Sequence, residues 1–342
     1  MSWTRRPERG SQWLMRFMAR LTLALGWHVG HALLYPITTY FLLVSGQARA
    51  ASRQYLAAVL GHEPKLADLF RHYFTFASVI LDRVFLLTGR TQAYDVQVRG
   101  LEKLQARIEA GQGCILMGAH LGSFEVLRAL ADQGCPVPVK VLMYEENAVR
   151  VSEVLNELNP RRMEGVIRLG STGAMLRVKE ALTAGELVGM LGDRITSGDK
   201  LVTASFLGRP AILPAGPIVL ASVLKAPVML VFGIHRGPRR YEITFEPFAE
   251  RVAVNHRARQ ADVSAWVQRY VERLEAVCRA YPYNWANFYD FWEGRNETTV
   301  AGTGLRGSAP PARWWYRLRR SGGPQGLDGS PLGGSGEPGQ LP

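Results

Sequence analysis

The segment Gly118–Glu125 carries the residue types best suited to chemistry, because it places a histidine five positions before a glutamate. A short apolar run, Cys114–Met117, precedes it, and a helix-like pattern begins near Phe124. The pair therefore stands at a predicted strand-to-helix junction. A neutral imidazole can remove a proton from a hydroxyl group there, and a nearby carboxylate can fix its tautomer. We predict that His120 is a general base and that Glu125 orients it.

Direct contact between these two side chains requires the chain to turn between them. Positions five apart on a continuous helix point about 140° away from each other, whereas Gly122 permits a turn. A histidine at such a junction is also frequently a structural hydrogen-bonding residue. The pattern alone leaves both interpretations open.

A second chemical candidate follows a later apolar run. Asp193 and Arg194 come directly after residues 187–191, and a loop with glycines, prolines and Arg209 follows at 206–217. The carboxylate suits the orientation of a donor or the capping of a loop, and an arginine suits the binding of a phosphate or carboxylate. The glycines predict a tight loop close to a ligand. Each arginine is equally compatible with an ordinary surface charge.

The elements that must position these residues alternate along the chain from about residue 96 to residue 292. Short apolar runs typical of strands lie at 114–119, 137–143, 165–169, 187–191 and 228–234, and a polar–apolar alternation, also typical of a strand, lies at 241–247. Helix-like segments lie at 124–133, 146–158, 171–184, 214–224 and 262–280. This alternation predicts an α/β fold with a largely parallel central sheet flanked by helices. Sites in such sheets form at the carboxyl ends of strands, and His120 and Asp193 both follow predicted strand ends.

Composition indicates an anionic partner and a reducing environment. The 342-residue chain has a net charge of +12, which favours a phospholipid surface or nucleic acid. Its three cysteines lie far apart without a C-x-x-C pair, so neither a disulfide framework nor a zinc site is indicated. No His, Cys and carboxylate cluster has ligand spacing, and no metal is expected.

The N-terminus favours the membrane as that partner. Leu21–Val44 is a run of 24 residues without Lys, Arg, Asp or Glu, which is long enough to span a bilayer, and several arginines precede it. Pro36 and the basic residues beyond the run weaken a straight crossing. An interfacial or re-entrant hairpin is therefore an alternative to one span, and a buried core helix is a third interpretation.

These patterns divide the chain into three parts. Residues 1–50 form a membrane anchor, residues 51–295 form the main catalytic domain, and residues 296–342 form a disordered tail rich in Gly and Pro. Within the tail, Arg313–Arg320 interleaves arginines with aromatic residues. This island suits an anionic membrane surface or single-stranded nucleic acid, and it is equally compatible with a solvated tail that has no partner.

Taken together, the segments resemble the bacterial lipid A biosynthesis acyltransferases of the lauroyl/myristoyl type, within the lysophospholipid acyltransferase superfamily. The resemblance covers roughly residues 10–295 and rests on the apolar N-terminal segment, GAHLGSFE at 118–125, Asp193, FLGRPAILPAGP at 206–217 and YPYNWANFYDFW at 281–292. It implies a glycerol-phosphate-acyltransferase-like fold. It also implies O-acyl transfer from acyl carrier protein or acyl-CoA to a hydroxyl of a lipid or glycolipid, at the cytoplasmic face of the inner membrane and without a cofactor.

The resemblance also implies roles for individual residues. His120 matches the family's base and Glu125 its partner, and Arg162 or Arg168 matches the family's essential arginine. Arg194 departs from the family, in which glutamine or another polar residue commonly follows the aspartate. The aromatic C-terminal motif also looks closer to a divergent branch than to the enzymes of core lipid A assembly. Both features leave the identity of the acceptor lipid open. The residues assigned to substrate binding are Arg162, Arg168, Asp193, Arg194 and Arg209.

Two other functions stay open at this point. The first is a lysophospholipid or glycerol-phosphate acyltransferase, whose phosphate-binding motif is matched by Glu164–Arg168 in spelling only. The second is a non-catalytic basic protein that binds membranes or nucleic acid, which explains the charge but not the His120 junction. No recognised nucleic-acid motif is present, so no nucleic acid is expected as a partner. No Gly-x-Ser-x-Gly elbow occurs, which argues against a covalent acyl-serine.

Overall fold

The computed structural model describes residues 12–127, 139–143, 153, 157–159, 165–196, 198–255 and 257–292. Its helices are α1 (Gln12–Leu25), α2 (Trp27–Val44), α3 (Gly46–Leu60), α4 (Leu66–Leu87), the 3-10 turn η2 (Thr91–Ala93), α5 (Leu101–Glu109), α8 (Ala174–Thr183), α9 (Gly216–Leu224) and α10 (Arg259–Ala280). Its strands are β1 (Asp95–Arg99), β2 (Cys114–Gly118), β3 (Val139–Met143), β4 (Val166–Arg168), β5 (Leu187–Leu191), β6 (Leu201–Phe206), β7 (Arg209–Pro214), β8 (Val228–Gly237) and β9 (Arg240–Ala249).

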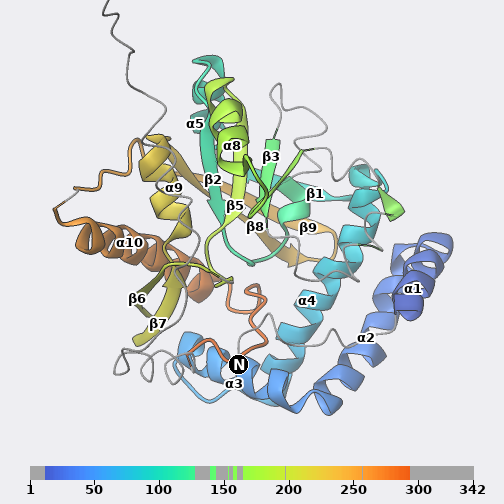
Figure 1. Cartoon of the computed structure of the whole chain (residues 1–342). Coiled ribbons are helices and arrows are strands. Elements are labelled where there is room, and N and C mark those ends of the chain that lie inside the picture. The colour runs from blue at the N-terminus through green and yellow to red at the C-terminus, as the bar shows by residue number, and fades with distance from the viewer. Residues whose placement is uncertain are drawn as a thin grey trace, which may run out of the picture. The chain divides into compact units, whose positions relative to one another are not determined.

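Seven of these strands form one sheet, in the order β1-β9-β8-β2-β5-β3-β4 (Figure 1). All neighbouring strands run parallel except β8 and β9, which pair antiparallel. The α/β fold with a largely parallel sheet that the alternating pattern predicted is therefore confirmed. β2 lies in the middle of the sheet and is buried along its whole length, as is expected of a parallel strand covered on both faces.

Two hydrophobic cores cover the two faces of this sheet. Ile115 and Met117 of β2 belong to the core that includes residues of α8, α9 and α10. Cys114 and Leu116, which point to the opposite face, belong to the core that includes residues of α4 and α5. The continuous apolar run that predicted a strand at 114–119 thus contributes side chains to both cores.

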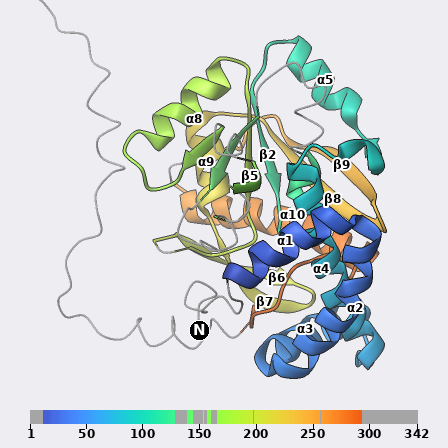
Figure 2. The same ribbon diagram turned by 90° about the vertical axis from the view of Figure 1, so that its right-hand side faces the viewer.

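The N-terminal helices pack on α4, as Figure 2 shows for α1 and α2. The uninterrupted helix that the run Leu21–Val44 suggested does not form, because α1 ends at Leu25 and Gly26 adopts a φ of 89° before α2 begins. That left-handed conformation is one that glycine adopts without the steric cost of a side chain. At Gly30 an added Cβ would lie 2.9 Å from Thr22 of α1 and 3.0 Å from Leu81 of α4, so the three helices meet closely there.

The described helices include no single one that is long and apolar enough to cross a membrane. α2 and α3 together meet the requirements of length and composition, with a bend of 96° between them.

The segment that was expected to form a tight loop near a ligand is instead a β-hairpin. β6 and β7 pair antiparallel from Leu201–Pro214 to Phe206–Arg209. The turn between them places Leu207 at a φ of 51° and Gly208 at 72°, the two left-handed residues that a two-residue hairpin turn needs. Pro210 and Pro214 fit because both strands of a two-stranded ribbon are edges.

Several expectations fall outside the described residues. They are most of the helices predicted at 146–158 and 124–133, Arg162, and the tail at 296–342 with its Arg313–Arg320 island. The division of the chain into an anchor, a catalytic domain and a tail stays a prediction.

Candidate active site

Two neighbouring strands bring the chemical candidates together. β2 and β5 pair in parallel with Gly118 opposite Leu191, the last residue of each strand. His120 and Asp193 each stand two positions beyond these partners, so they lie at equivalent points on the carboxyl edge of the sheet. A hydrogen bond from Gly192 N to Gly118 O, 2.9 Å long, keeps the two strand ends together.

The loop after β2 is fixed by close backbone contacts. Gly122 has a φ of 65°, and a Cβ at this position would lie 1.9 Å from the carbonyl oxygen of Gly233 in β8. The turn between His120 and Glu125 that the sequence predicted at this glycine is thus present. Ser123 N donates to Gly233 O at 2.7 Å, and Ser123 Oγ accepts from Val126 N at 3.4 Å. The serine therefore caps the helical segment that begins at residue 124.

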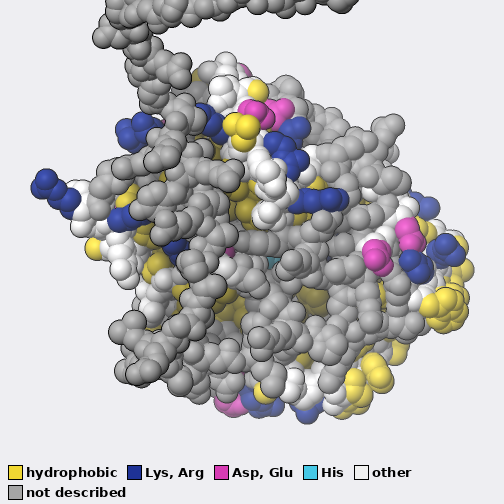
Figure 3. All heavy atoms as spheres, in the orientation of Figure 1, with side chains coloured by type: hydrophobic (Ala, Val, Ile, Leu, Met, Phe, Trp, Pro, Cys, Tyr) yellow, Lys and Arg dark blue, Asp and Glu magenta, His cyan; other side chains and the backbone are white. Residues whose placement is uncertain are grey.

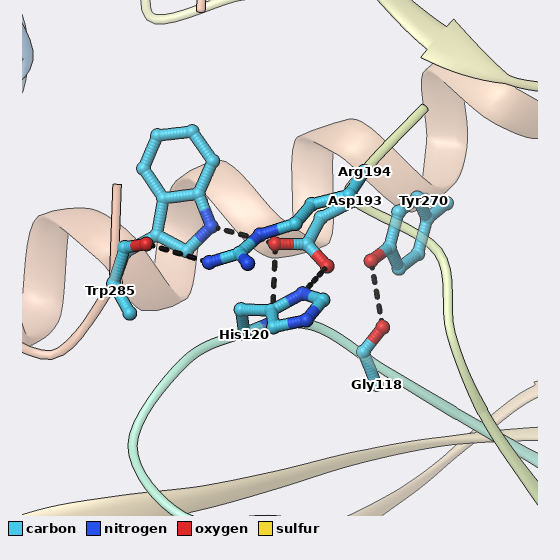
Figure 4. Close-up of polar contacts among 7 residues, drawn as sticks. Gly118, His120, Asp193, Arg194, Tyr270 and Trp285 are labelled. Carbon is cyan, nitrogen blue, oxygen red and sulfur yellow. Dashed lines mark hydrogen bonds and ion pairs between the residues drawn. The ribbon is translucent and has the colours of Figure 1, made fainter. Parts of the chain in front are cut away.

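Asp193 is the carboxylate that holds His120. Its Oδ1 lies 2.8 Å from His120 Nδ1, and its Oδ2 accepts from the His120 backbone N–H at 3.0 Å (Figure 4). The imidazole nitrogen that sequence reasoning gave to Glu125 is thus bound to Asp193. Proximity in sequence favoured the glutamate, whereas the pairing of β2 with β5 brings the aspartate to the ring.

The charges around this pair favour a neutral histidine beside an ionised aspartate. Burial lowers the pKa of His120, the positive charge of Arg194 lowers it further, and Asp193 opposes both effects. Burial raises the pKa of Asp193, but the charge and hydrogen bond of His120, the charge of Arg194 and the hydrogen bond from Trp285 together lower it to about 2. An ionised carboxylate only accepts hydrogen bonds, so Nδ1 carries the proton and Nε2 presents its lone pair. The His120 side chain is 31% exposed, so solvent or a ligand can reach it.

A third contact comes from the end of the described chain. Trp285 is buried, and its indole Nε1 donates to Asp193 Oδ2 at 2.9 Å. Figure 4 shows the carboxylate between the indole and the imidazole. The sequence gave YPYNWANFYDFW only as part of a resemblance and did not assign it to the site. A conspicuous group of aromatic residues just before a Gly-rich segment was the available signal.

The predicted substrate-binding arginines are spread over different elements. Arg194 adjoins Asp193, donates to Ala286 O at 2.8 Å and lies over the Tyr289 ring. Arg168 is exposed at the end of β4, which is the carboxyl edge of an outer strand. Arg209 begins β7 in the hairpin and stacks over Trp292 with 5.0 Å between the guanidinium and the ring centroid.

Another arginine, which sequence reasoning missed, lies near the histidine. Arg83 of α4 forms an ion pair with Glu125, with 3.8 Å between Nε and Oε1, and its charge contributes to lowering the pKa of His120. Its side chain is about a quarter exposed. Arg83 sits within a helix without a motif around it, and only the packing of α4 against the sheet brings it to this edge.

A comparison with known families decides the class of the protein. The sequence model of the bacterial lipid A biosynthesis acyltransferase family matches residues 2–293, which is most of the chain. The chain belongs to this family. No curated protein sequence matches it. Membership makes the protein an acyltransferase that uses an acyl donor and a lipid acceptor, and it decides against the non-catalytic alternative.

Acyl transfer also needs donors for the oxyanion that forms on the attacked carbonyl. Backbone amides and arginine side chains are the two kinds of donor to consider in this acyltransferase. The four amides of residues 120–123 are already hydrogen-bonded, to Asp193 Oδ2, Ala119 O, Asn284 O and Gly233 O in that order. These four amides therefore already serve structural hydrogen bonds, and among the described residues Arg83 and Arg194 place positive charge near His120.

The described residues of the acyltransferase contain no group of three or more His, Cys, Asp or Glu side chains arranged to hold a metal ion.

Proposed function

We propose that the protein transfers a fatty acyl group from an acyl thioester to a hydroxyl of a lipid A-like glycolipid, with His120 as the general base. The observation that carries this proposal is the hydrogen bond from His120 Nδ1 to the buried Asp193. It engages Nδ1, so Nε2 is the ring nitrogen left to accept a proton, and the side chain is partly exposed, as a base acting on an external hydroxyl requires.

The reaction is a direct transfer. The acceptor hydroxyl donates to Nε2 of His120 and loses its proton as its oxygen attacks the thioester carbonyl. Asp193 stabilises the imidazolium that forms, and Arg83 and Arg194 supply positive charge to the oxyanion. When the C–S bond breaks, the imidazolium returns its proton to the leaving thiolate. No acyl-enzyme forms on this route, so a burst of covalently acylated protein on mixing with donor would contradict it.

The acyl donor is acyl carrier protein or acyl-CoA, and the net charge of +12 favours both, since each is anionic. Release of the free thiol from each donor in the presence of a membrane lipid extract distinguishes the two. We expect thiol release to require both the lipid extract and His120.

The acceptor is identified by comparing lipids. Mass spectrometry of lipids from cells with and without the gene should reveal one lipid that lacks a single acyl chain in the deletion strain. Wild-type protein and a His62→Ala variant, which changes an exposed histidine, should restore that chain, whereas His120→Ala should not. Restoration by His120→Ala would refute the assignment of the base.

We further propose that the protein reaches its lipid at the cytoplasmic face of the inner membrane through one flank of α1 and α2. Many large apolar side chains there are exposed, and Figure 3 shows hydrophobic groups beside Lys and Arg at this flank. The exposed members are Trp13, Phe17, Leu25, Val29, Tyr35, Tyr40, Leu43 and Val44. α2 itself carries no charged residue, and arginines occur in α1 and α3 on either side of it. This combination suits an interfacial helix on an anionic bilayer.

Flotation with liposomes tests this contact. We expect the protein to float with vesicles that contain phosphatidylglycerol and Leu43→Glu to lose most of that binding. Leu176→Glu changes another highly exposed leucine, on α8, and should bind like wild type. Alkaline carbonate should extract an interfacial protein from inner membranes, so retention after that wash would indicate a crossing helix instead.

A further inference from the structure

The carboxylate of Asp193 is held at both oxygens. Oδ1 accepts from the His120 ring, whereas Oδ2 accepts from the His120 backbone N–H and from the indole N–H of Trp285. The first two donors belong to the residue that the carboxylate must orient. Trp285 is therefore a donor that holds Asp193 independently of its histidine.

Trp285 is itself tied to the loop that carries the histidine. Leu121 and Trp285 form an antiparallel bridge. On either side of it, Ala286 N donates to His120 O at 2.8 Å and Gly122 N donates to Asn284 O at 2.9 Å. The indole and the imidazole thus project from two backbone segments that are hydrogen-bonded to each other, which sets the distance between them.

The far side of Trp285 rests on the N-terminal helices. His72 of α4 is fully buried, and its Nε2 lies 2.8 Å from Trp285 O while its Nδ1 lies 2.7 Å from Ser52 Oγ of α3. Burial lowers the pKa of His72 to about 4, so its ring is neutral at physiological pH. A carbonyl only accepts, so Nε2–H donates to Trp285 and Nδ1 accepts from the Ser52 hydroxyl. The Trp285 ring also meets that of Tyr55 from α3, with 5.0 Å between centroids.

We propose that Trp285 is a positioning residue of the acyltransferase: its indole N–H holds the Asp193 carboxylate, and Asp193 in turn keeps His120 in the Nδ1–H tautomer with Nε2 presented to the acceptor hydroxyl. The proposal rests on the proposed function, because it assumes that His120 is the base. Trp285 acts through Asp193 and does not meet the reacting atoms. The chain Ser52–His72–Trp285 links the N-terminal helices to the catalytic edge of the sheet.

The test compares one substitution at two tryptophans of the same aromatic group. Trp285 and Trp292 are both buried, and both rings contact those of Phe206 and Phe291. Within the described residues, Trp292 Nε1 has no hydrogen-bond partner. Trp285→Phe and Trp292→Phe therefore remove the same indole atoms. Only in Trp285→Phe does the lost N–H donate to Asp193.

We expect Trp285→Phe to lower kcat by roughly 10- to 100-fold, as for loss of a hydrogen bond to a charged group, with KM unchanged within about twofold. Trp292→Phe should keep kcat within about threefold of wild type. A Trp285→Phe enzyme with wild-type kcat would overturn the proposal. Equal losses of kcat in both variants would overturn it as well, because packing alone would then explain them.

A second variant covers the case in which Trp285→Phe does not fold. Trp285→3-benzothienylalanine, introduced by codon suppression, keeps the shape of the indole and replaces its N–H by sulfur. We expect the same loss of kcat in a protein that still unfolds cooperatively, because the ring keeps its shape and packing. A wild-type kcat in this variant would overturn the proposal, because an active enzyme must be folded.

Nitrogen NMR of isotope-labelled histidine separates this proposal from the proposed function. His120, assigned by the signal that His120→Ala removes, should show the Nδ1–H tautomer in wild type and a mixture of tautomers in the benzothienyl variant. An unchanged tautomer would overturn the role of Trp285 even if His120→Ala is inactive. A changed tautomer in a protein whose His120→Ala variant still transfers acyl groups would support that role and refute His120 as the base.

Discussion

The molecule contains two buried aspartates that look alike until their partners are compared. Asp82 in α4 and Asp193 after β5 are each 1% exposed, and each accepts a hydrogen bond from an indole N–H. Trp27 donates to Asp82 at 2.6 Å, and Trp285 donates to Asp193 at 2.9 Å. Burial and hydrogen bonding therefore do not distinguish a structural carboxylate from a catalytic one.

The remaining partners make the difference. Asp82 accepts from the hydroxyls of Tyr94 and Tyr241, which stay neutral over the physiological range, and burial raises its pKa. Asp193 accepts from a histidine whose ring is partly exposed, and its pKa is held at about 2. In the proposed mechanism, Asp193 serves catalysis because it is coupled to a base that a substrate can reach.

The largest effect in this comparison is expected for Asp193→Asn. The amide cannot stabilise an imidazolium, and it favours the wrong His120 tautomer, so we expect kcat to fall by roughly a thousandfold or more. Steady-state thiol release with a saturating donor measures kcat. Asp82→Asn is the matched control and should retain kcat within about twofold. Comparable losses of kcat in the two variants would remove the distinction between the aspartates.

Glu125→Gln should have a smaller effect than Asp193→Asn. Glu125 pairs with Arg83, so the substitution removes charge near the site but leaves the His120 Nδ1 contact in place. We expect kcat to fall by roughly tenfold, the effect of one weakened polar contact. The measurement is the kcat ratio of the two variants under identical conditions. A loss in Glu125→Gln as large as that in Asp193→Asn would restore the glutamate as the orienting residue.

The sequence predicted the strands of this sheet well because their apolar runs are local signals. Runs at 187–191 and 228–234 correspond to β5 and to the first part of β8, and His120 and Asp193 follow strand ends as expected. The order of the strands is a different matter. β3 and β4 separate β2 from β5 along the chain, yet β2 and β5 are neighbours in the sheet. Long-range packing decides such pairing, and no short segment encodes it.

The same reason explains the contacts of His120 that sequence reasoning did not foresee. Glu125 was chosen as the partner of His120 because it lies five positions away, whereas Asp193 lies 73 positions away and Trp285 a further 92. Gly26 interrupts the apolar run at 21–44, and its left-handed φ had to be seen to divide the run. Sequence periodicity identified the elements, and tertiary contacts selected which side chains meet.

The pH dependence of activity should show an acid limb set by the His120 pair. His120 has a lowered pKa and acts in its neutral form, so we expect activity to fall as the pH drops, with a midpoint below the usual value of about 6.5. Measurement of kcat/KM between pH 4.5 and 8, with an acceptor that does not titrate in that range, locates the midpoint. A midpoint at or above 6.5 would contradict the electrostatics described for this site.

Stability must be recorded alongside that profile. His72 and His235 have pKa values of about 4 in the folded protein because they are buried. Between pH 4 and the usual histidine value of about 6.5, the unfolded chain therefore binds more protons than the folded one, and stability falls as the pH falls. An unfolding curve at each pH separates loss of the base from loss of the fold.

The smallest effect on activity and the most informative effect on stability are expected for Asp82→Asn. Its pKa is raised by burial, so ionisation of Asp82 costs stability as the pH rises through the folded-state value. Asparagine does not titrate but offers one acceptor oxygen fewer to Trp27, Tyr94 and Tyr241. We expect a loss of about 1–3 kcal/mol in the free energy of unfolding at pH 5 and a smaller loss at pH 8. Urea unfolding in mild detergent at both pH values measures these losses. Equal losses at the two pH values would mean that Asp82 does not titrate between pH 5 and pH 8, and within that range its contrast with Asp193 would lie in geometry alone.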